Sequence, residues 1–315
     1  MVNRHLRIGT RGSKMALIQA KAVRDRLEQA FPELEPEIVV IQTSGDWKPE
    51  HGEKPLSEAD GGKGLFAKEI ELALLSHEVD IAVHSVKDMP SFLPEGLTMM
   101  HYLPRDDVHD AFLSEKYQSF DDLPEGATIG SASVRRRGFL LNMRPDLKVI
   151  DIRGNVTTRI EKMLNGNVDA LVLSASGLDR IQANDYTRSV FSAQEMLPAC
   201  GQGTIGIEFL ETQTDIRDLL SQIHDVETGY CMSAERGALR ALDGSCRTPV
   251  GAYARRNGGH NGDSLTLTVS VVRLDGTKIW TETSTCVGES DHDFDQFGFA
   301  LGLKIKDLID PDILL

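Results

Sequence analysis

Short apolar runs alternate with amphipathic segments along the first two-thirds of the chain, which predicts an α/β fold. Residues 6–9 and 37–43 have the apolar, β-branched composition of strands, and residues 80–84 form a short buried strand. Between the first two strands, apolar residues recur at the spacing of one helical face: Ala16, Leu17, Ala20, Val23 and Leu27. Strands and helices that alternate in this way build helix-covered sheets.

The alternation restarts after a polar break at residues 104–107, the first candidate for a hinge. Strands are predicted at 97–101, 128–130, 147–152 and 170–174, and helices at 65–76, 133–143 and 155–164. A late strand at 204–210 follows Gly201-Gln202-Gly203, and we expect it to cross back to the first domain. The expected first domain therefore comprises residues 1–103 plus about 203–222, and the second comprises residues 108–198.

The pattern changes beyond residue 225. Helices are predicted at 227–242 and 291–309. Between them lie three strand-like runs, at 250–255, 265–273 and 279–287. Strands grouped between helices in this way predict a small α+β domain over residues 225–315.

Composition favours a folded protein of a reducing compartment. The hydrophobic content is 40%, and no run of about 18 apolar residues is present to span a membrane. The N-terminus enters a strand pattern without a signal-peptide core. The four cysteines are widely spaced without a CxxC pair, which argues against a disulfide framework or a zinc site. We therefore expect a cytoplasmic protein without a membrane partner or a bound metal.

Charge is unevenly distributed. The formal net charge of −14 is opposite to that of a typical nucleic-acid-binding protein. Residues 131–160 nevertheless contain seven Lys or Arg against two Asp. A local cationic cluster in an acidic protein suggests a small anionic ligand, and solvated surface arginines are the alternative.

Three predicted strand-to-helix turns share one chemistry. Residues 10–13, 131–136 and 153–159 each combine Ser, Thr or Asn with Arg at a helix start. Backbone N–H groups at helix N-termini bind anions, and Arg grips a carboxylate at two points. Ordinary capping explains one such turn, but three indicate a ligand with several carboxylates or phosphates.

Two further segments have alternative interpretations. Asp88 follows the buried strand 80–84, where the helical pattern breaks at Met89-Pro90. Its carboxylate is suited to stabilise a cation or accept a proton. The alternative is an aspartate that caps a turn. His84 is expected to be a buried histidine with its hydrogen bonds satisfied. Residues 61–64, Gly-Gly-Lys-Gly, suit a mobile lid with one cation or a plain surface loop.

Cys246 lies in a predicted loop between Gly244 and Pro249, followed by Arg247. The neighbouring guanidinium favours the reactive thiolate, so a covalent site and a structural thiol are both compatible with this segment.

Together these segments resemble the porphobilinogen deaminase (hydroxymethylbilane synthase) family. The similar stretches are collinear, at residues 6–13, 61–66, 80–90, 130–136, 153–159, 198–206 and 242–251. The resemblance implies two periplasmic-binding-protein-like domains around a cleft, plus a small α+β C-terminal domain. It implies a transferase that condenses four porphobilinogen molecules into linear hydroxymethylbilane, releasing four ammonia, in porphyrin and haem biosynthesis. A dipyrromethane cofactor would be attached through Cys246.

The resemblance also implies roles for particular residues. Asp88 would be the catalytic carboxylate, which hydrogen-bonds pyrrole N–H groups and stabilises the azafulvenium cation formed when ammonia leaves. Cofactor contacts would come from Cys246, Lys87, Ser85, Ser133, Arg135, Arg136 and Asp46. Substrate contacts would come from Arg11, Ser13, Lys63, Arg153, Arg159, Arg180 and Gln202. The sequence departs from the family at Ala132, where a Ser is common, and at Ala59, where some members have Lys.

Two other classes of protein share part of this pattern. A non-enzymatic protein that clamps an anion has the two-lobed α/β pattern but needs no Cys246. A cysteine acyl transferase needs a histidine base, and no His is near Cys246 in sequence. The acidic surface favours a monomer that binds the small molecule porphobilinogen and no nucleic acid.

Overall fold

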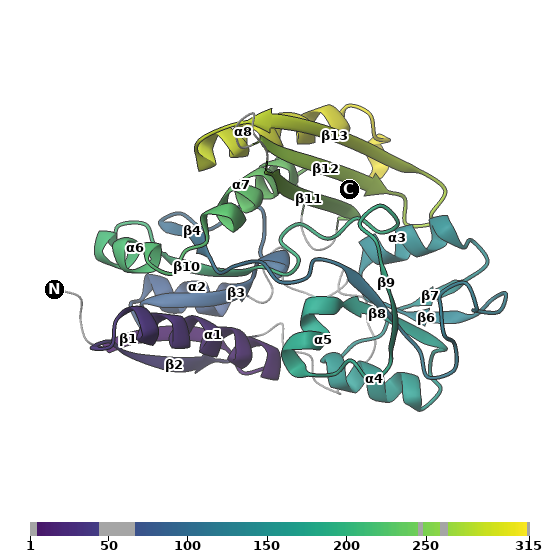
Figure 1. Cartoon of the computed structure of the whole chain (residues 1–315), viewed down its shortest axis with the longest axis horizontal. Coiled ribbons are helices and arrows are strands. Elements are labelled where there is room, and N and C mark those ends of the chain that lie inside the picture. Colours follow the sequence, from purple (N-terminus) through teal and green to yellow (C-terminus); the bar gives the residue numbers. More distant parts are fainter. Residues whose placement is uncertain (1–4, 44–66, 245–247, 259–263, 314–315) are drawn as a thin grey trace.

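The computed structural model describes residues 5–43, 67–244, 248–258 and 264–313, which form three β-sheets with helices packed on them (Figure 1). The first sheet has the order β2-β1-β3-β10-β4. Its strands are β2 (Glu35–Ile41), β1 (His5–Arg11), β3 (Ile81–Ser85), β10 (Ile205–Leu210) and β4 (Leu97–Tyr102). Strands β2, β1 and β3 are parallel, whereas β10 is antiparallel to both β3 and β4.

Strand β10 confirms the expectation that a late strand crosses back to the first sheet. It pairs with β3 from Ile205↔Ser85 to Phe209↔Ile81. Helices α1 (Lys14–Ala30) and α6 (Thr214–Ser221) share the apolar core on one face of this sheet, and α2 (Lys68–Leu75) packs on the other. Both faces are covered, which explains why β3 and β10 are almost continuously apolar.

The second sheet has the order β7-β6-β8-β5-β9. Its strands are β7 (Lys148–Ile150), β6 (Thr128–Gly130), β8 (Ala170–Ser174), β5 (Asp110–Leu113) and β9 (Thr187–Phe191). Helix α3 (Val134–Met143) packs on one face, and α4 (Val156–Leu164) and α5 (Ala175–Ile181) pack on the other. The sequence pattern did not predict β5, β9, α5 or α6.

The third sheet is antiparallel, with β11 (Val250–Asn257), β12 (Ser264–Val272) and β13 (Ile279–Val287) in chain order. Helices α7 (Val226–Ala241) and α8 (Asp291–Lys306) pack against it and against each other. A side chain at Gly298 would collide with the Ala234 carbonyl, so glycine permits the close approach of the two helices.

Two segments connect the first two sheets, at residues 103–109 and 198–204, and one buried carboxylate joins them. Glu235 of α7 accepts hydrogen bonds from Arg105 (Nη1 at 2.6 Å, Nη2 at 3.1 Å) in the first segment. It also accepts from the Gly201 backbone N–H at 2.7 Å in the second segment. A fourth N–H, from the backbone of Ala254 in β11, donates to Glu235 at 2.8 Å. The C-terminal sheet is thereby tied to both connections.

The mixed α/β architecture with a small C-terminal sheet and its helices confirms the predicted fold class. Element boundaries agree with the pattern to within a few residues, and β8 and β13 agree completely. Among the described helices, none is long and apolar enough to cross a bilayer.

Candidate functional site

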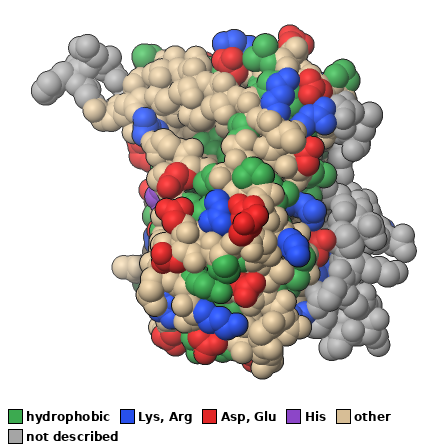
Figure 2. All heavy atoms as spheres, turned by 90° about the vertical axis from the view of Figure 1, so that its right-hand side faces the viewer, with side chains coloured by type: hydrophobic (Ala, Val, Ile, Leu, Met, Phe, Trp, Pro, Cys, Tyr) green, Lys and Arg blue, Asp and Glu red, His purple; other side chains and the backbone are tan. Residues whose placement is uncertain are grey.

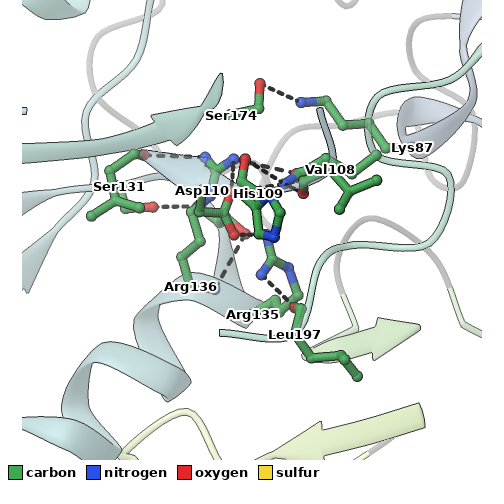
Figure 3. Close-up of polar contacts among 12 residues, drawn as sticks. Lys87, Val108, His109, Asp110, Ser131, Arg135, Arg136, Ser174 and Leu197 are labelled. Atoms are coloured by element: carbon green, nitrogen blue, oxygen red, sulfur yellow. Dashed lines mark hydrogen bonds and ion pairs between the residues drawn. The ribbon is translucent and has the colours of Figure 1, made fainter. Parts of the chain in front are cut away.

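The first part of the site is the turn after β3. A single turn of 3₁₀ helix, η3 (Val86–Asp88), follows Ser85, and Val86 is buried while Lys87 and Asp88 are partly exposed. The Lys87 ammonium donates a hydrogen bond to Ser174 Oγ at 3.1 Å (Figure 3). Ser174 ends β8, so this contact joins the carboxyl ends of parallel strands in the first and second sheets.

Lys87 has a titration behaviour suited to an anion site. Burial lowers the pKa of Lys87 to about 8; the Asp88 carboxylate opposes that shift, and the nearby Arg136 guanidinium adds to it. The amine therefore changes charge near neutral pH, and an anionic ligand would favour its charged form.

The second part of the site is a buried charge cluster around Asp110, the first residue of β5 (Figure 3). Arg135 Nη2 donates to one carboxylate oxygen of Asp110 at 2.8 Å, and Arg136 Nε donates to the other at 2.8 Å. Gln202 Nε2 adds a third hydrogen bond at 2.9 Å. Asp110 is fully buried. Three charge-assisted hydrogen bonds compensate its removal from water.

The charge cluster fixes the ionisation of Asp110. Burial alone would raise the pKa of Asp110, but the guanidinium groups of Arg135 and Arg136 and the Gln202 amide outweigh it, so the pKa falls to about 2. Backbone carbonyls complete the arrangement, because Arg135 Nη1 donates to Leu197 O at 2.7 Å and Arg136 Nη1 donates to Val172 O at 3.2 Å. Both arginines are thus held by β5; Arg135 is also held by Leu197, just before the second connecting segment, and Arg136 by β8.

These contacts change the picture of the basic cluster at residues 131–160. Arg135 and Arg136 are 3% and 7% exposed, so they form an internal site and add nothing to a cationic surface. On the face shown in Figure 2, basic and acidic side chains are interspersed.

Each of the three predicted turns begins a helix with a side-chain cap. Ser13 Oγ accepts from Ala16 N–H at 3.3 Å, Ser133 Oγ from Arg136 N–H at 3.4 Å, and Asn155 Oδ1 from Thr158 N–H at 2.8 Å. The capping interpretation therefore holds for all three, and any role of these residues in ligand binding has to coexist with it.

The remaining predicted arginines occupy different surroundings. Arg180 donates to Asp106 Oδ2 and to Gly203 O, both at 2.9 Å, so its guanidinium is bound to the two connecting segments. Arg159 Nε donates to Gly154 O at 2.8 Å. Arg11 ends β1, and Arg153 precedes α4.

Two residues near the Asp88 turn have local partners. Ser85 Oγ accepts from Gln19 Nε2 at 2.7 Å, which links the end of β3 to α1. His84 is buried as expected, with Nε2 2.9 Å from the Glu208 carboxylate, but this contact lacks hydrogen-bond geometry, so the expectation of satisfied hydrogen bonds is wrong for Nε2. That contact lies between β3 and β10, so His84 is a core residue.

Cys246, Asp46, Lys63 and Ala59 lie outside the described residues. Among the described cysteines, burial raises the pKa of Cys200 and of Cys231 to about 12, and it also raises the pKa of Cys286. Thiols with raised pKa values are poor nucleophiles, so these three are suited to structural roles.

Sequence reasoning missed three residues that shape the site or anchor the connecting segments. Asp110 stands just after a polar break and begins a strand of four residues, which gives no local pattern to detect. Ser174 and Glu235 lie inside apolar or helical runs, and their partners are 87 and 130 residues away. Such contacts depend on tertiary structure, and one sequence carries no signal for them.

Comparison with known proteins identifies related sequences along most of the chain. The family model described as "Porphobilinogen deaminase, dipyromethane cofactor binding domain" matches residues 6–218, and the model of the C-terminal domain of the same family matches residues 229–307. A porphobilinogen deaminase of Nitrobacter hamburgensis is 46% identical over 88% of this chain and 85% of that protein. The chloroplastic enzyme of Oryza sativa is 44% identical over 96% and 83%.

A third relative, the porphobilinogen deaminase of Geobacter metallireducens, is 41% identical over 97% of this chain and 92% of that protein. Among solved structures, the periplasmic VFT2 domain of Bordetella pertussis BvgS is similar to 70% of this chain, over 86% of its own, with 17% identity and a TM-score of 0.43. The two family models together match most of the chain, and the relatives carry the same family name. The chain therefore belongs to the porphobilinogen deaminase family.

Proposed function

We propose that this protein is a transferase that condenses four porphobilinogen molecules into linear hydroxymethylbilane and releases four ammonia. The observation that best supports it is the meeting of two kinds of group at one place. Lys87, next to Asp88, contacts Ser174, and Ser174 is paired in register with Asp110 of the arginine cluster. The Asp88 carboxylate, which can stabilise a developing cation, thus lies near Lys87 and the arginines, which can bind the carboxylates of a substrate.

The same place fits a dipyrromethane cofactor, the group that the first family model names. Arg135 Nε is buried without a hydrogen-bond partner among the described residues, and the Lys87 ammonium lies close enough to Arg136 and Asp110 for their charges to influence its pKa. Lys87, Ser85, Ser133, Arg135, Arg136 and Asp46 would hold the cofactor, and Cys246 would carry it through a thioether. When bound, the cofactor supplies the pyrrole end to which the first substrate is joined.

In this proposal Asp88 acts on the substrate. Loss of ammonia leaves positive charge on the pyrrole, and the adjacent carboxylate stabilises that charge and accepts pyrrole N–H hydrogen bonds. Lys87 and the arginines neutralise the acetate and propionate groups, because every added pyrrole brings two more carboxylates. Arg11, Ser13, Lys63, Arg153, Arg159, Arg180 and Gln202 remain the proposed substrate contacts.

We further propose that the chain acts as a cytoplasmic monomer and that its domains divide at the two connecting segments. The hydrogen-bonding of Asp106 N–H to Gly203 O at 3.1 Å supports this division, because it pairs the two segments side by side.

Intact mass spectrometry tests the covalent cofactor. The wild-type protein is expected to show a mass excess of two pyrrole units, and Cys246→Ser is expected to fold without this excess. Cys286→Ser is the matched control and should keep it. Persistence of the excess in Cys246→Ser, or its absence from the wild type, would contradict the proposed attachment.

Turnover of porphobilinogen tests the role of Asp88. Asp88→Asn is expected to keep the cofactor mass and lose about 100-fold or more in turnover, as expected when one electrostatic group is removed. Asp80→Asn is the control at the other end of β3, where Asp80 binds Arg7 at 2.7 Å, and it should retain turnover. Near-normal turnover of Asp88→Asn would remove Asp88 from the catalytic role. A protein that only clamps an anion would show neither the mass excess nor turnover.

A further inference from the structure

A polar pocket, separate from the proposed catalytic site, lies between the first sheet and the C-terminal helices. Its volume is about 360 Å³, and its walls come from the segment 91–93, β4, α7 and α8. Helix α7 contributes Ser233, Arg236 and Arg240, which share one helical face because they lie three and four residues apart. The charge cluster around Asp110 contributes no residue to this lining.

Two hydrogen-bond donors of this pocket lack an acceptor. Ser91 and Arg236 are 5% and 9% exposed, and both line the pocket. Ser91 Oγ and Arg236 Nη1 are buried without a hydrogen-bond partner among the described residues. A buried donor without an acceptor is destabilising, so an occupant with acceptor oxygens would be stabilised here.

The charge of Arg236 is likewise uncompensated within the described part of the chain. Arg240, one turn away, is paired with Asp295 at 2.7 Å. Arg236 donates only to a backbone carbonyl, from Nη2 to Pro90 O at 3.1 Å. One guanidinium without a carboxylate, beside a hydroxyl donor, selects an anion over a neutral carbonyl compound.

The remaining lining is mixed: Thr98, Tyr102, Ser233 and the Arg240–Asp295 ion pair are polar, and one wall is apolar. Leu93, Leu97 and Met99 line it, together with Phe92, which is 54% exposed. An apolar wall beside a cationic donor pair suits a ligand with a flat apolar body and one carboxylate. We propose that this pocket binds a small aryl carboxylate, with Ser91 and Arg236 holding the carboxylate and the residues of segment 91–93 and β4 contacting the ring.

Titration of the cofactor-bearing enzyme with benzoate, followed by saturation-transfer NMR, tests the site. Benzoate is expected to bind saturably with a millimolar Kd, and benzyl alcohol, which has no charge, at least tenfold more weakly. Arg236→Gln should weaken benzoate binding at least tenfold and Ser91→Ala about threefold. Because Ser91 forms no hydrogen bond that the fold needs, Ser91→Ala decides the matter if Arg236→Gln fails to fold.

Two control variants separate this pocket from other sites. Arg26→Gln alters a different surface pocket, beside His224, and should leave the benzoate Kd unchanged. Lys87→Met alters the proposed catalytic site and should also leave it unchanged. Loss of binding in Lys87→Met with retention in Ser91→Ala would show that benzoate occupies the substrate site, and it would overturn the proposal. Unchanged affinity in Ser91→Ala, or no saturable binding, would do the same.

Discussion

The first and second sheets share one arrangement but differ at one register position. In each, three parallel strands are followed by a fourth strand that runs antiparallel to them and a fifth that is antiparallel to the fourth, and the fourth strand begins just after a connecting segment. The fourth strand of the first sheet starts with Ile205, opposite Ser85, whereas that of the second sheet starts with Asp110, opposite Ser174. An apolar side chain in one sheet thus corresponds to a buried carboxylate in the other.

This difference gives the two sheets different roles in the site. In the second sheet, Asp110 fixes Arg135 and Arg136 by hydrogen bonds and keeps their charges in a defined geometry. In the first sheet, the strand equivalent to β8 ends in a single turn, which leaves Lys87 and Asp88 partly exposed. The second sheet therefore provides a buried, preorganised charge cluster, and the first provides Lys87, an amine whose charge responds to ligand and pH.

The largest expected effect comes from exchanging the buried carboxylate. Asp110→Asn leaves two buried guanidinium groups without their anion, and we expect it to lower the free energy of unfolding by about 3–5 kcal/mol. The matched change in the first sheet, Ile205→Val, removes one methyl group and should cost about 1 kcal/mol. Urea denaturation of both variants measures the difference. Equal losses would mean that the two positions are energetically equivalent and would break the comparison.

A smaller effect is expected from pH. Because the pKa of Lys87 is lowered to about 8, its cationic fraction falls about tenfold between pH 7 and pH 9. If that cation binds substrate carboxylates, the KM for porphobilinogen rises by about tenfold over this range. Lys87→Arg keeps its charge and should show little of this rise. A wild-type KM that follows the Lys87→Arg profile would exclude Lys87 as the titrating group.

The smallest expected effect tests the contact between the two sheets. Ser174→Ala removes the acceptor of the Lys87 ammonium, which favours the neutral amine, so the midpoint of the KM–pH profile should move to lower pH by about 0.5. Ser85→Ala, at the equivalent position of the first sheet, removes a hydrogen bond to Gln19 and should leave the midpoint in place. Equal shifts in both variants would show that the Ser174 contact has no specific influence on Lys87.

Periodicity predicted the elements that bury a whole face or stripe. Strands β8 and β13 and helices α1 and α3 are long or apolar enough for the pattern to be unambiguous, and Ser13 and Ser133 mark the helix starts as capping residues. Strand β9 was missed because it is mostly half-exposed, and α5 because its seven residues, with Gly177 among them, give hardly two turns. Local sequence is weakest where the element is short.

The residues of the site follow the same rule: those in local motifs were predicted, and those defined by tertiary contacts were not. The resemblance and the turn chemistry predicted Lys87, Asp88, Arg135 and Arg136 as candidates, and the structure brings Lys87 close to the arginines through Ser174 and Asp110. The sequence did not indicate that one carboxylate, Asp110, binds both arginines, because they lie 25 and 26 positions from it on α3 and reach β5 only through tertiary packing. Tertiary contacts decide which cations stay available to a ligand.

Glu235 has a consequence for motion. Its two carboxylate oxygens bind Arg105 of one connecting segment and Gly201 of the other, and both are anchored to β11 through Ala254. If one lobe rotates against the other, the axis passes close to this carboxylate, since the hydrogen bonds there permit the least displacement. Atoms near the axis, such as those of Gln202, would then travel little, while the outer strands β2 and β7 would sweep the longest arcs.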